Sequence, residues 1–467
     1  MTALPPPPHE TPADAGQPKR WQAGTLTYTK GSLALLFFWL LWGDFAWALQ
    51  DRTVPPVVQL LFRHFGASDT LVGLLFASLP AAIGLVLMPL VGYRSDRLRS
   101  RWGRRIPFLL GPIPFIVLSM VGLAFAPRIG SALGRLSPFS SLSPELLVLT
   151  ALGVGWTMFQ IGSTVANSVF GALINDVVPQ EVIGRFFGLF RAFSLLAGIL
   201  LNYAVMGKAE SHSTGIFLGV GLLYGIGFLL MCLKVKEGSY PPPPAPAPER
   251  DVRPGRGLLS PVRLYFKDSL GHPYYRWFFA ATLFCLVSIA PFNIYSVFYA
   301  KSLGMEMDVF FKCIAASFGV SLVLAYPLGV LVDRFHPLQV GLVVIALYGL
   351  TMLWGIVFVK DAASFLIVLM AHTILSGTYF TAVASLGQRL LPRTKFAEIA
   401  SAGSVLGSLA TIAMPPLLGC VLDRSGHHYA YVFYAGLALT AAGIASGCVL
   451  HRKFVALGGP ARYRAPE

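Results

Sequence analysis

The sequence predicts an all-α membrane protein in which twelve transmembrane helices form two pseudo-symmetric six-helix bundles. Three observations support this fold class. The 467-residue chain is 55% hydrophobic and only 12% charged, and soluble domains carry about twice that charged fraction. Long apolar runs recur from residue 31 to residue 450. Two short patterns of the first half also return at equivalent places in the second half.

The apolar runs match the length of membrane-spanning helices, which need ~20 predominantly apolar residues. A helix satisfies its own backbone hydrogen bonds in lipid, and the short alternating segments of a membrane barrel do not occur here. The twelve expected spans are 31–50, 71–92, 106–126, 145–172, 184–206, 214–234, 276–299, 310–332, 338–358, 363–390, 397–422 and 429–450.

Polar segments divide the chain. The N-terminal segment, beginning "MTALPPPPHETPADAGQPKR", is proline-rich and lacks the pattern of a signal peptide, so we expect a disordered tail. The largest gap between apolar runs contains "YPPPPAPAPERDVRPGRG", which is typical of an extended linker. The expected order is a tail at 1–30, a bundle at 31–234, a linker at 235–275, a bundle at 276–452 and a tail at 453–467.

The net charge of +15 is distributed asymmetrically across the expected membrane. Apart from Arg191, which lies inside a span, most of the 36 Lys and Arg fall on the side that holds both termini. This bias predicts cytoplasmic termini and contact with anionic lipid, so the charge requires no nucleic-acid partner. The few basic residues expected on the opposite side are Arg52, Arg63, Arg128, Arg135, Lys208, Lys301, Lys312, Lys360 and Arg424.

The sequence does not indicate an enzyme. Its five cysteines are scattered through predicted spans without paired spacing, so we expect neither a disulfide nor a metal site. It contains no Gly-x-Ser-x-Gly elbow, no phosphate-binding loop and no His/Glu metal motif. We therefore expect no cofactor.

An internal repeat links the two halves. The second run ends in "GYRSDR" (92–97) and the eighth in "GVLVDR" (329–334). The loop after the fourth run reads "INDVVPQEVIGRFFG", and the loop after the tenth reads "GQRLLPRTKFAEIAS", with prolines at matching places. Two echoes in the same order favour a six-plus-six repeat, which is a common construction of secondary transporters with a midplane site.

The loop after the second run resembles the signature loop of the major facilitator superfamily. Its longer form, "SDRLRSRWGRRIPFLLGPIPF", is similar to that of the glycoside–pentoside–hexuronide:cation symporters and sucrose transporters, and "ANSVFGALINDVVP" supports this resemblance. We expect the glycine at 92 to let the chain turn tightly out of the bilayer. The resemblance implies the major facilitator fold and a gating role for Gly92, Asp96, Arg97, Arg105, Asp333 and Arg334.

The first span carries two acids, Asp44 and Asp51, seven residues apart on one helical face. Trp47 lies one turn after Asp44. A carboxylate accepts hydrogen bonds from sugar hydroxyls, and a partly desolvated carboxylate can carry a proton. We predict both acids as proton-coupling residues, and Asp44 and Trp47 as sugar-binding residues. The alternative is that Asp44 serves helix packing and that Asp51 pairs with Arg52 at a loop edge.

Arg191 lies where sucrose-transporter relatives carry a substrate-binding arginine, although it could instead snorkel to the headgroups. Gln160 lies where those relatives carry an aspartate, and the second span contains no acid. Because few carboxylates are available to ligate sodium, the sequence favours the proton over the sodium ion as the coupling ion. Transport without a coupling ion remains an alternative. The remaining substrate-binding candidates are Asn167, Asn293, Tyr295, Tyr299, His372 and Tyr379.

The sequence thus predicts a monomeric transporter of a bacterial inner membrane that moves a sugar or glycoside by alternating access, with proton symport. One alternative keeps the fold and changes the cargo to an organic anion or a hydrophobic compound. Another is a non-transporting membrane sensor or assembly factor. Convergence of Asp44, Gln160, Arg191, Asn293 and His372 on one cavity would favour transport of a polar solute.

Overall fold

The computed structural model describes residues 20–136, 141–240, 271–392 and 396–466. Within these residues, twelve helices are long and apolar enough to cross a membrane. This confirms the predicted fold class of twelve helices in two six-helix bundles. Most of the predicted tail at 1–30 and of the linker at 235–275 lies outside the described residues.

The first bundle starts at α1 and ends at α8. Its second span is α2 and α3 joined by the π-helical turn η2, its third is α4 with α5, and the short 3₁₀ turn η4 precedes α8. The bounds are α1 (Lys30–His64), α2 (Asp69–Gly73), η2 (Leu74–Ser78), α3 (Leu79–Arg97), α4 (Ile106–Leu110), α5 (Pro112–Leu133), α6 (Pro144–Val177), α7 (Ile183–Ala204), η4 (Met206–Lys208) and α8 (Ser213–Lys234).

The second bundle repeats this plan from α10 to α16. Its fourth span continues from α13 into α14, and a short helix, α17, follows the last span. The bounds are α10 (Pro273–Ser302), α11 (Met307–Phe335), α12 (Pro337–Phe358), α13 (Ala362–Val383), α14 (Leu386–Leu390), α15 (Phe396–Arg424), α16 (Tyr431–Ala456) and α17 (Gly459–Arg462).

The first helix is longer than its apolar run indicates. The run was expected to end at residue 50, but α1 continues through Pro55 and Pro56 to His64. Prolines are tolerated in membrane helices because neighbouring groups satisfy the freed backbone carbonyls. Asp51 and Arg52 therefore lie inside the helix, and the prediction that they stand at a loop edge is wrong.

A small hairpin precedes α1, within the segment that was expected to be disordered. Strands β1 (Trp21–Ala23) and β2 (Leu26–Tyr28) pair antiparallel. Gly24 supplies the positive φ of +57° that the turn requires. The Thr25 hydroxyl accepts a hydrogen bond of 2.8 Å from the Ser239 backbone N–H, so the hairpin is joined to the segment after α8.

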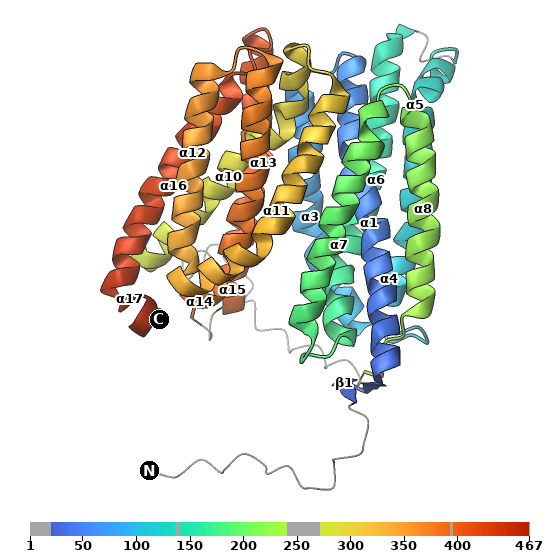
Figure 1. Cartoon of the computed structure of the whole chain (residues 1–467). Helices are drawn as coiled ribbons and strands as arrows, with labels where there is room; N and C mark the ends of the chain where they lie inside the picture. Colours follow the sequence, from blue (N-terminus) through green and yellow to red (C-terminus); the bar gives the residue numbers. More distant parts are fainter. Residues whose placement is uncertain (1–19, 137–140, 241–270, 393–395, 467) are drawn as a thin grey trace, which may run out of the picture.

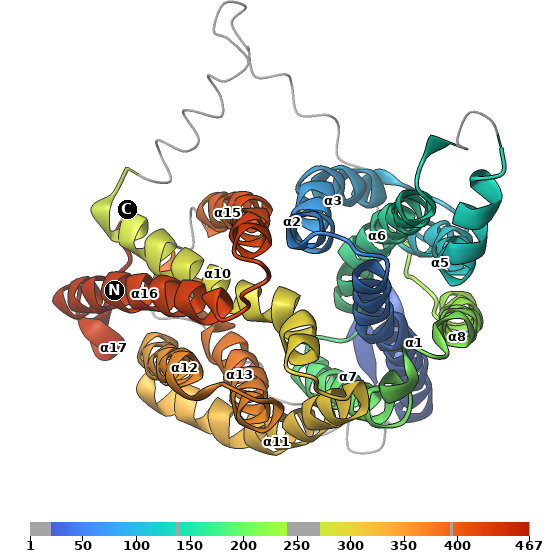
Figure 2. The same ribbon diagram turned by 90° about the horizontal axis from the view of Figure 1, so that it is seen from above.

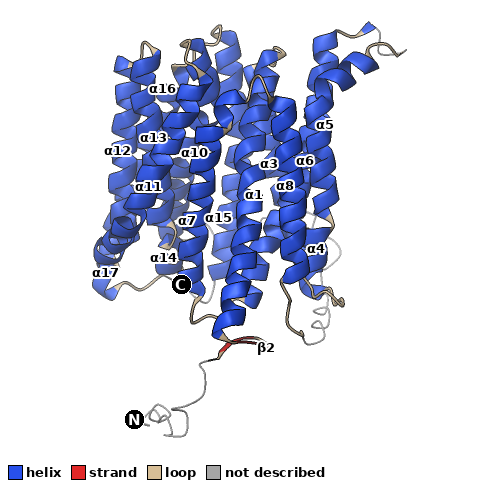
Figure 3. Cartoon of the chain, turned by 45° about the vertical axis from the view of Figure 1, so that its right-hand side comes forward, coloured by secondary structure: helices blue, strands red, loops and turns tan. Residues whose placement is uncertain are grey.

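The two bundles stand side by side, as the blue-to-green and yellow-to-red helices of Figure 1 show. Viewed from above in Figure 2, α2 lies beside α15 and α7 beside α11. Figure 3 shows that helices make up nearly the whole described chain. We call the side on which both bundles begin and end the termini side, and the opposite one the far side.

The bundles are joined towards the far side. Hydrogen bonds and ion pairs between described residues of the two bundles connect the start of α2 to the end of α15, η2 to α15, and Glu210 to Lys301. In Figure 1 the ribbons separate towards the termini side. There, a cavity of about 460 Å³ lies along α10 and α15 and reaches Ala81 of α3. The molecule is therefore closed on the far side.

Candidate functional site

A second cavity, of about 390 Å³, lies between the two bundles. We call it the central cavity. It is bounded by α1 and α7 of the first bundle and by α10, α11 and α13 of the second. Its walls combine phenylalanine rings with a few polar groups, which is the usual composition of a small-molecule site. The polar side chains include Arg52, Gln59, Asn202, Asn293, Ser296 and His372.

Arg52 lines the central cavity, although the sequence predicts it in an outer loop. Its Nη2 donates a hydrogen bond of 3.0 Å to the hydroxyl of Ser194 on α7. Its guanidinium carbon stands 4.9 Å from the ring centre of Phe318 on α11, which is a cation–π contact between the bundles. The sequence signal that could have found it is the apolar stretch after Pro56, which continues the helix past residue 52.

The charges on α1 form a group around Arg52. The guanidinium interacts electrostatically with Asp44, Asp51 and Arg191. Neither Asp51 nor Arg191 of α7 is covered by neighbouring helices of the described structure. The group therefore contains two acids and two bases, so its formal charges balance.

Asp44 is buried, with 3% of its surface exposed. Its Oδ2 atom has no hydrogen-bond partner among the described residues. A buried ionised carboxylate without a hydrogen-bond donor is costly, so this environment favours the neutral, protonated acid. Gln50 Nε2 and Thr53 Oγ1 on the same helix are also buried without a partner among these residues.

His372 on α13 holds Asn293 at the cavity wall. The Nε2 atom of His372 is 2.9 Å from Asn293 Oδ1, and its Nδ1 is 3.1 Å from the Tyr348 hydroxyl. With the imidazole proton on Nε2, the Tyr348 hydroxyl donates to Nδ1 and Nε2–H donates to Asn293. Asn293 is exposed while His372 is buried, which leaves the Asn293 amide group to donate into the cavity.

Four aromatic candidates lie outside the lining of the central cavity. Trp47 packs against the rings of Tyr224 and Phe228 on α8, at centroid distances of 6.3 and 6.0 Å. This packing covers part of the ring surface that is expected to stack on a sugar, and the ring stays partly exposed. Three buried tyrosines also pack elsewhere, namely Tyr295 at the far side, Tyr299 against Phe365, and Tyr379 beside a smaller cavity. Their predicted contact with substrate is not supported by these positions.

The polar residues of α6 form a separate face. Gln160 and Asn167 are seven residues apart and partly or fully exposed, and neither lines the central cavity. Between them, Ser163 lies 3.5 Å from Gln50 of α1. Of the five residues expected to converge, Asn293 and His372 line the central cavity, and Asp44 and Arg191 interact with Arg52 at its wall.

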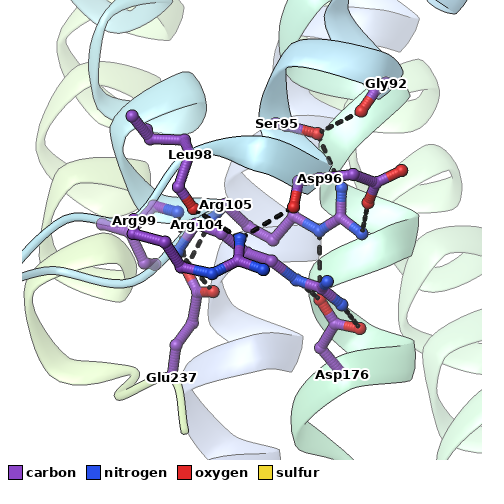
Figure 4. Close-up of polar contacts among 10 residues, drawn as sticks. Gly92, Ser95, Asp96, Leu98, Arg99, Arg104, Arg105, Asp176 and Glu237 are labelled. Carbon is purple, nitrogen blue, oxygen red and sulfur yellow. Dashed lines mark hydrogen bonds and ion pairs between the residues drawn. The ribbon is translucent and has the colours of Figure 1, made fainter. Parts of the chain in front are cut away.

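On the termini side, two of the predicted gating residues, Asp96 and Arg105, belong to a charge network within the first bundle (Figure 4). Arg105 is 7% exposed. It pairs with Asp96 at 2.6 Å and with Asp176 at 3.0 Å, and it donates to the Ser95 hydroxyl at 2.6 Å. This arginine thus ties the ends of α3 and α6 together. Arg97 instead stacks over Tyr93, with its guanidinium carbon 3.6 Å from the ring centre.

Glu237, after α8, fixes the loop that carries these arginines. Its carboxylate accepts backbone hydrogen bonds of 2.9, 2.8 and 2.7 Å from Arg104, Arg105 and Ile106, as expected of an acid at a helix N-terminus. Gly103 makes the tight turn, with φ of +103°. Gly92 lies inside α3, so the prediction that it turns the chain is wrong.

Outside the membrane spans, Arg104 shares the Asp176 carboxylate, with its Nη2 at 2.7 Å. Burial alone lowers the pKa of the Arg104 guanidinium, but the hydrogen bond and the charge of Asp176 raise it above the ordinary value overall. The arginine therefore stays charged at any physiological pH.

The second bundle carries a simpler version of this network. Asp333 pairs with Arg389 at 2.9 Å, while Arg334 lies over the ring of Phe335. Arg389 and Asp176 each precede the matching loop proline by three residues. This repeated position thus carries an acid in the first bundle and a base in the second. In the first bundle Arg105 bridges two acids, Asp96 and Asp176, whereas in the second bundle Asp333 pairs directly with Arg389.

Comparison with known proteins agrees with this architecture. The family model described as "Major Facilitator Superfamily" matches residues 34–415. "Solute carrier family 45 member 4" of Mus musculus is 25% identical over 225 residues, which cover 46% of this chain and 27% of that protein. "Sucrose transport protein SUC4" of Arabidopsis thaliana is 30% identical over 166 residues, which cover 34% of this chain and 30% of that protein. The chain thus matches less than a third of the length of these curated relatives.

Solved structures share the fold at low sequence identity. A D-xylose–proton symporter has a TM-score of 0.59 and 16% identity, with 90% of this chain and 96% of that chain covered. A POT family transporter in complex with 5-aminolevulinic acid has a TM-score of 0.63 and 12% identity, with coverage of 90% and 97%. With the helix order, the repeat and the cavity between two bundles, these matches lead to one conclusion: the chain belongs to the Major Facilitator Superfamily.

Proposed function

We propose that the chain imports a neutral sugar or glycoside by alternating access, in symport with protons. The observation that carries this proposal is the central cavity, where phenylalanine rings surround a few hydrogen-bonding groups from both bundles. A cavity wall that offers both hydrogen-bond donors and acceptors suits a polyhydroxylated solute, because each hydroxyl group can donate and accept a hydrogen bond. The matched segments of sucrose transport proteins and the fold shared with a D-xylose–proton symporter support the same substrate class.

In this proposal, substrate recognition is shared between the bundles. Arg52 is held by Ser194 and can donate to hydroxyl or ring oxygens through its remaining N–H groups. On the opposite wall, Asn293 is oriented by His372 and offers its amide group. Phe318 and Phe292 provide apolar surface for the C–H face of a sugar ring. A solute that contacts both walls would couple its binding to the closure of the bundles.

Asp44 is the proposed proton carrier. Its buried position and its unpartnered Oδ2 favour the protonated form. Arg52 lies within electrostatic reach and favours the ionised form. A change in the position of Arg52 on substrate binding would therefore alter the proton affinity of Asp44, which is the requirement for coupling. Asp51 is the second acid that interacts with Arg52, and we propose that it assists this transfer.

The orientation follows from the basic residues. Moving Arg52 from an outer loop into α1 strengthens the asymmetry between the two sides. We propose that the termini side is cytoplasmic and that the chain is a monomer of a bacterial inner membrane. The network around Arg105 is then a cytoplasmic element, and we propose that Asp96, Arg97, Asp333 and Arg334 contribute to gating on that side.

An organic anion is the second candidate cargo, since Arg52 and Arg191 both lie near the cavity. Asp51 offsets one of these charges, and Asp44 offsets the other whenever it is ionised, which favours a neutral solute. Binding of unlabelled compounds to the purified protein separates the two. We expect disaccharides and glucosides to raise the midpoint of thermal unfolding and to bind with similar affinity at low and high salt. Stabilisation by carboxylate compounds alone, weakened by salt, would contradict the sugar assignment.

A further inference from the structure

Six residues on the far side join the bundles in a set of short polar contacts, which we call the closing cluster. Its members are Asp69 and Thr70 of the first bundle and Tyr295, Asp423, His427 and Tyr429 of the second. The Asp423 carboxylate accepts hydrogen bonds from the backbone N–H groups of Asp69 and Thr70 at 2.7 and 2.9 Å. The Thr70 hydroxyl donates to the same carboxylate at 2.5 Å. An acid of one bundle therefore caps a helix of the other.

Asp69 is the centre of the cluster and only 1% exposed. Its Oδ2 lies 2.6 Å from His427 Nδ1, and its Oδ1 accepts a hydrogen bond of 3.0 Å from the Tyr429 hydroxyl. The Tyr295 hydroxyl donates to the carbonyl of Pro415 at 2.8 Å and lies 3.1 Å from that of Asp69. Each of these contacts to Asp69 crosses between the bundles and must break when the far side opens.

The bundles approach so closely that only glycine fits at the contact. A Cβ atom on Gly419 of α15 would lie 2.5 Å from the Asp69 carbonyl oxygen. His427 itself adopts φ of +64°, a conformation that residues other than glycine rarely take. Its backbone N–H donates to the Leu422 carbonyl at 2.8 Å, which holds this turn. The turn thus places the imidazole against a buried acid at the cost of backbone strain.

The charges around His427 are unequal. The ionisable groups that face it in the described structure are Asp69 of α2, Asp423 of α15, the phenols Tyr295 and Tyr429, and Arg63 of α1. The guanidinium carbon of Arg63 lies 5.8 Å from the Tyr429 ring centre. Counted together with Arg63, which lies beside the cluster, these groups carry two negative charges and one positive charge when the imidazole is neutral, and a proton on His427 balances them.

We propose that His427 is a proton-binding site whose occupation stabilises the far-side closed state. A protonated imidazole forms a charged hydrogen bond to Asp69 only while the bundles are together, because the two residues belong to different bundles. A proton on His427 would therefore shift the population towards the closed state, the state in which this contact exists. The side chain of His427 is 42% exposed, so protons can reach it from the far side.

This inference rests on the proposed function for its direction. If the far side faces the exterior, a proton arriving from outside favours closure of the exterior gate and opening towards the cytoplasm. That is the step that follows substrate loading during import. The site is separate from Asp44, so the cluster would set the rate and population of the closing step while Asp44 carries the transported proton.

The test measures the conformational equilibrium without any sugar. Spin labels are placed at the exposed far-side residues Ala132 and Ala363 of the two bundles, in protein whose five cysteines are replaced by alanine. Double electron–electron resonance then gives the ratio of short to long distances between pH 8 and pH 5.5. We expect the closed-to-open ratio to rise about tenfold as the pH falls and to lose this dependence in His427→Gln, which keeps a neutral hydrogen-bond donor.

His428→Gln is the matched control. His428 is the next residue and is exposed, and its imidazole makes no hydrogen bond within the described cluster, so the pH shift should remain. A shift that persists in His427→Gln, or no shift in the protein with native His427, would overturn the proposal. Amide exchange of residues 69–78, compared between native and His427→Gln protein at the same pH, repeats the test with all cysteines in place. If the native protein shows this pH shift but takes up no sugar, the proposed cargo is contradicted and the role of His427 is not.

Discussion

Arg52 shows how a single side chain can join the two bundles. It is fixed on one side by the Ser194 hydroxyl and on the other by the face of Phe318. Both contacts depend on the planar shape of the guanidinium, and a lysine ammonium would reproduce only the charge.

We therefore expect Arg52→Lys to fold normally and to raise the KM for the transported sugar about tenfold, because the lost contacts correspond to about 1.4 kcal/mol. Initial uptake rates over a range of sugar concentrations measure this change. Arg191→Lys is the control, since Arg191 does not line the central cavity. An unchanged KM in Arg52→Lys would remove Arg52 from the site.

His372 acts through Asn293. In His372→Leu, the Asn293 carbonyl oxygen and the Tyr348 hydroxyl both lose a partner, so the amide group is no longer oriented. We expect the KM to rise at least about tenfold. His372→Gln can reach both partners through its own amide and should recover much of the affinity. Equal losses in both variants would indicate that His372 serves packing alone.

The sequence was sufficient to find Asn293 and His372, because polar residues inside apolar spans are costly and uncommon. It was insufficient for Arg52, because a charge followed by two prolines resembles the end of a span. Trp47 and Tyr299 were predicted from the same kind of signal but do not line the central cavity. Aromatic rings in a helix pack against neighbouring helices as well as they stack on a ligand, and only the tertiary arrangement distinguishes the two.

At the scale of elements, the loop between α3 and α4 is a structural joint. Arg105 is buried and joined to two acids on different helices. Removing it would leave Asp176 with Arg104 alone and Asp96 without an ion pair in the described network. Because Asp96 is half exposed and Asp176 keeps Arg104, the loss is that of the charged hydrogen bonds of Arg105, about 2 kcal/mol.

Arg105→Ala should therefore lower the unfolding midpoint of the detergent-solubilised protein by several degrees. Arg97→Ala is the matched control, because Arg97 stacks on the exposed ring of Tyr93 and should change the midpoint little. Thermal denaturation followed by intrinsic fluorescence checks both. Equal midpoints for the two variants would show that the network does not stabilise the bundle.

The turn between α11 and α12 gives a pH prediction. Burial, with the positive charges of Arg389 and His451, lowers the pKa of His336 to about 4 from an ordinary value of 6.5. Its Nδ1 accepts the Leu338 backbone N–H at 3.3 Å, which requires a neutral ring. As the pH falls from 7 towards 4, His336 takes up a proton in the unfolded chain before it does so in the folded chain. The contribution of His336 to folding stability is therefore fully present above pH 6.5 and is lost as the pH falls towards 4.

Lowering the pH from 8 to 5 should accordingly reduce the free energy of unfolding by about 2 kcal/mol through the titration of His336. His336→Asn removes this titration, caps the helix, and tolerates the positive φ of 77° at this position. Urea unfolding at the two pH values should show a smaller loss in His336→Asn than in the native chain. The same loss in both proteins would exclude His336 as its source.

At the scale of the molecule, the sequence predicted the twelve spans and the six-plus-six repeat because both follow from apolar run length and from motifs that recur in order. It could not predict the closing cluster. Asp69, Asp423 and His427 lie near the ends of spans, where charged residues are ordinary, and Asp69 is more than 350 residues away in sequence from the other two. Only the packing of the two bundles makes them a unit.

The central claim is that a substrate cavity between the bundles is coupled to protons through Asp44. Uptake of a labelled disaccharide into proteoliposomes, with and without an inward proton gradient, tests it most directly. We predict accumulation above equilibrium in the native chain, and its loss in Asp44→Asn while gradient-free exchange continues. Gradient-driven accumulation that persists in Asp44→Asn would contradict the coupling, and no uptake of any sugar by folded native protein would contradict the substrate class.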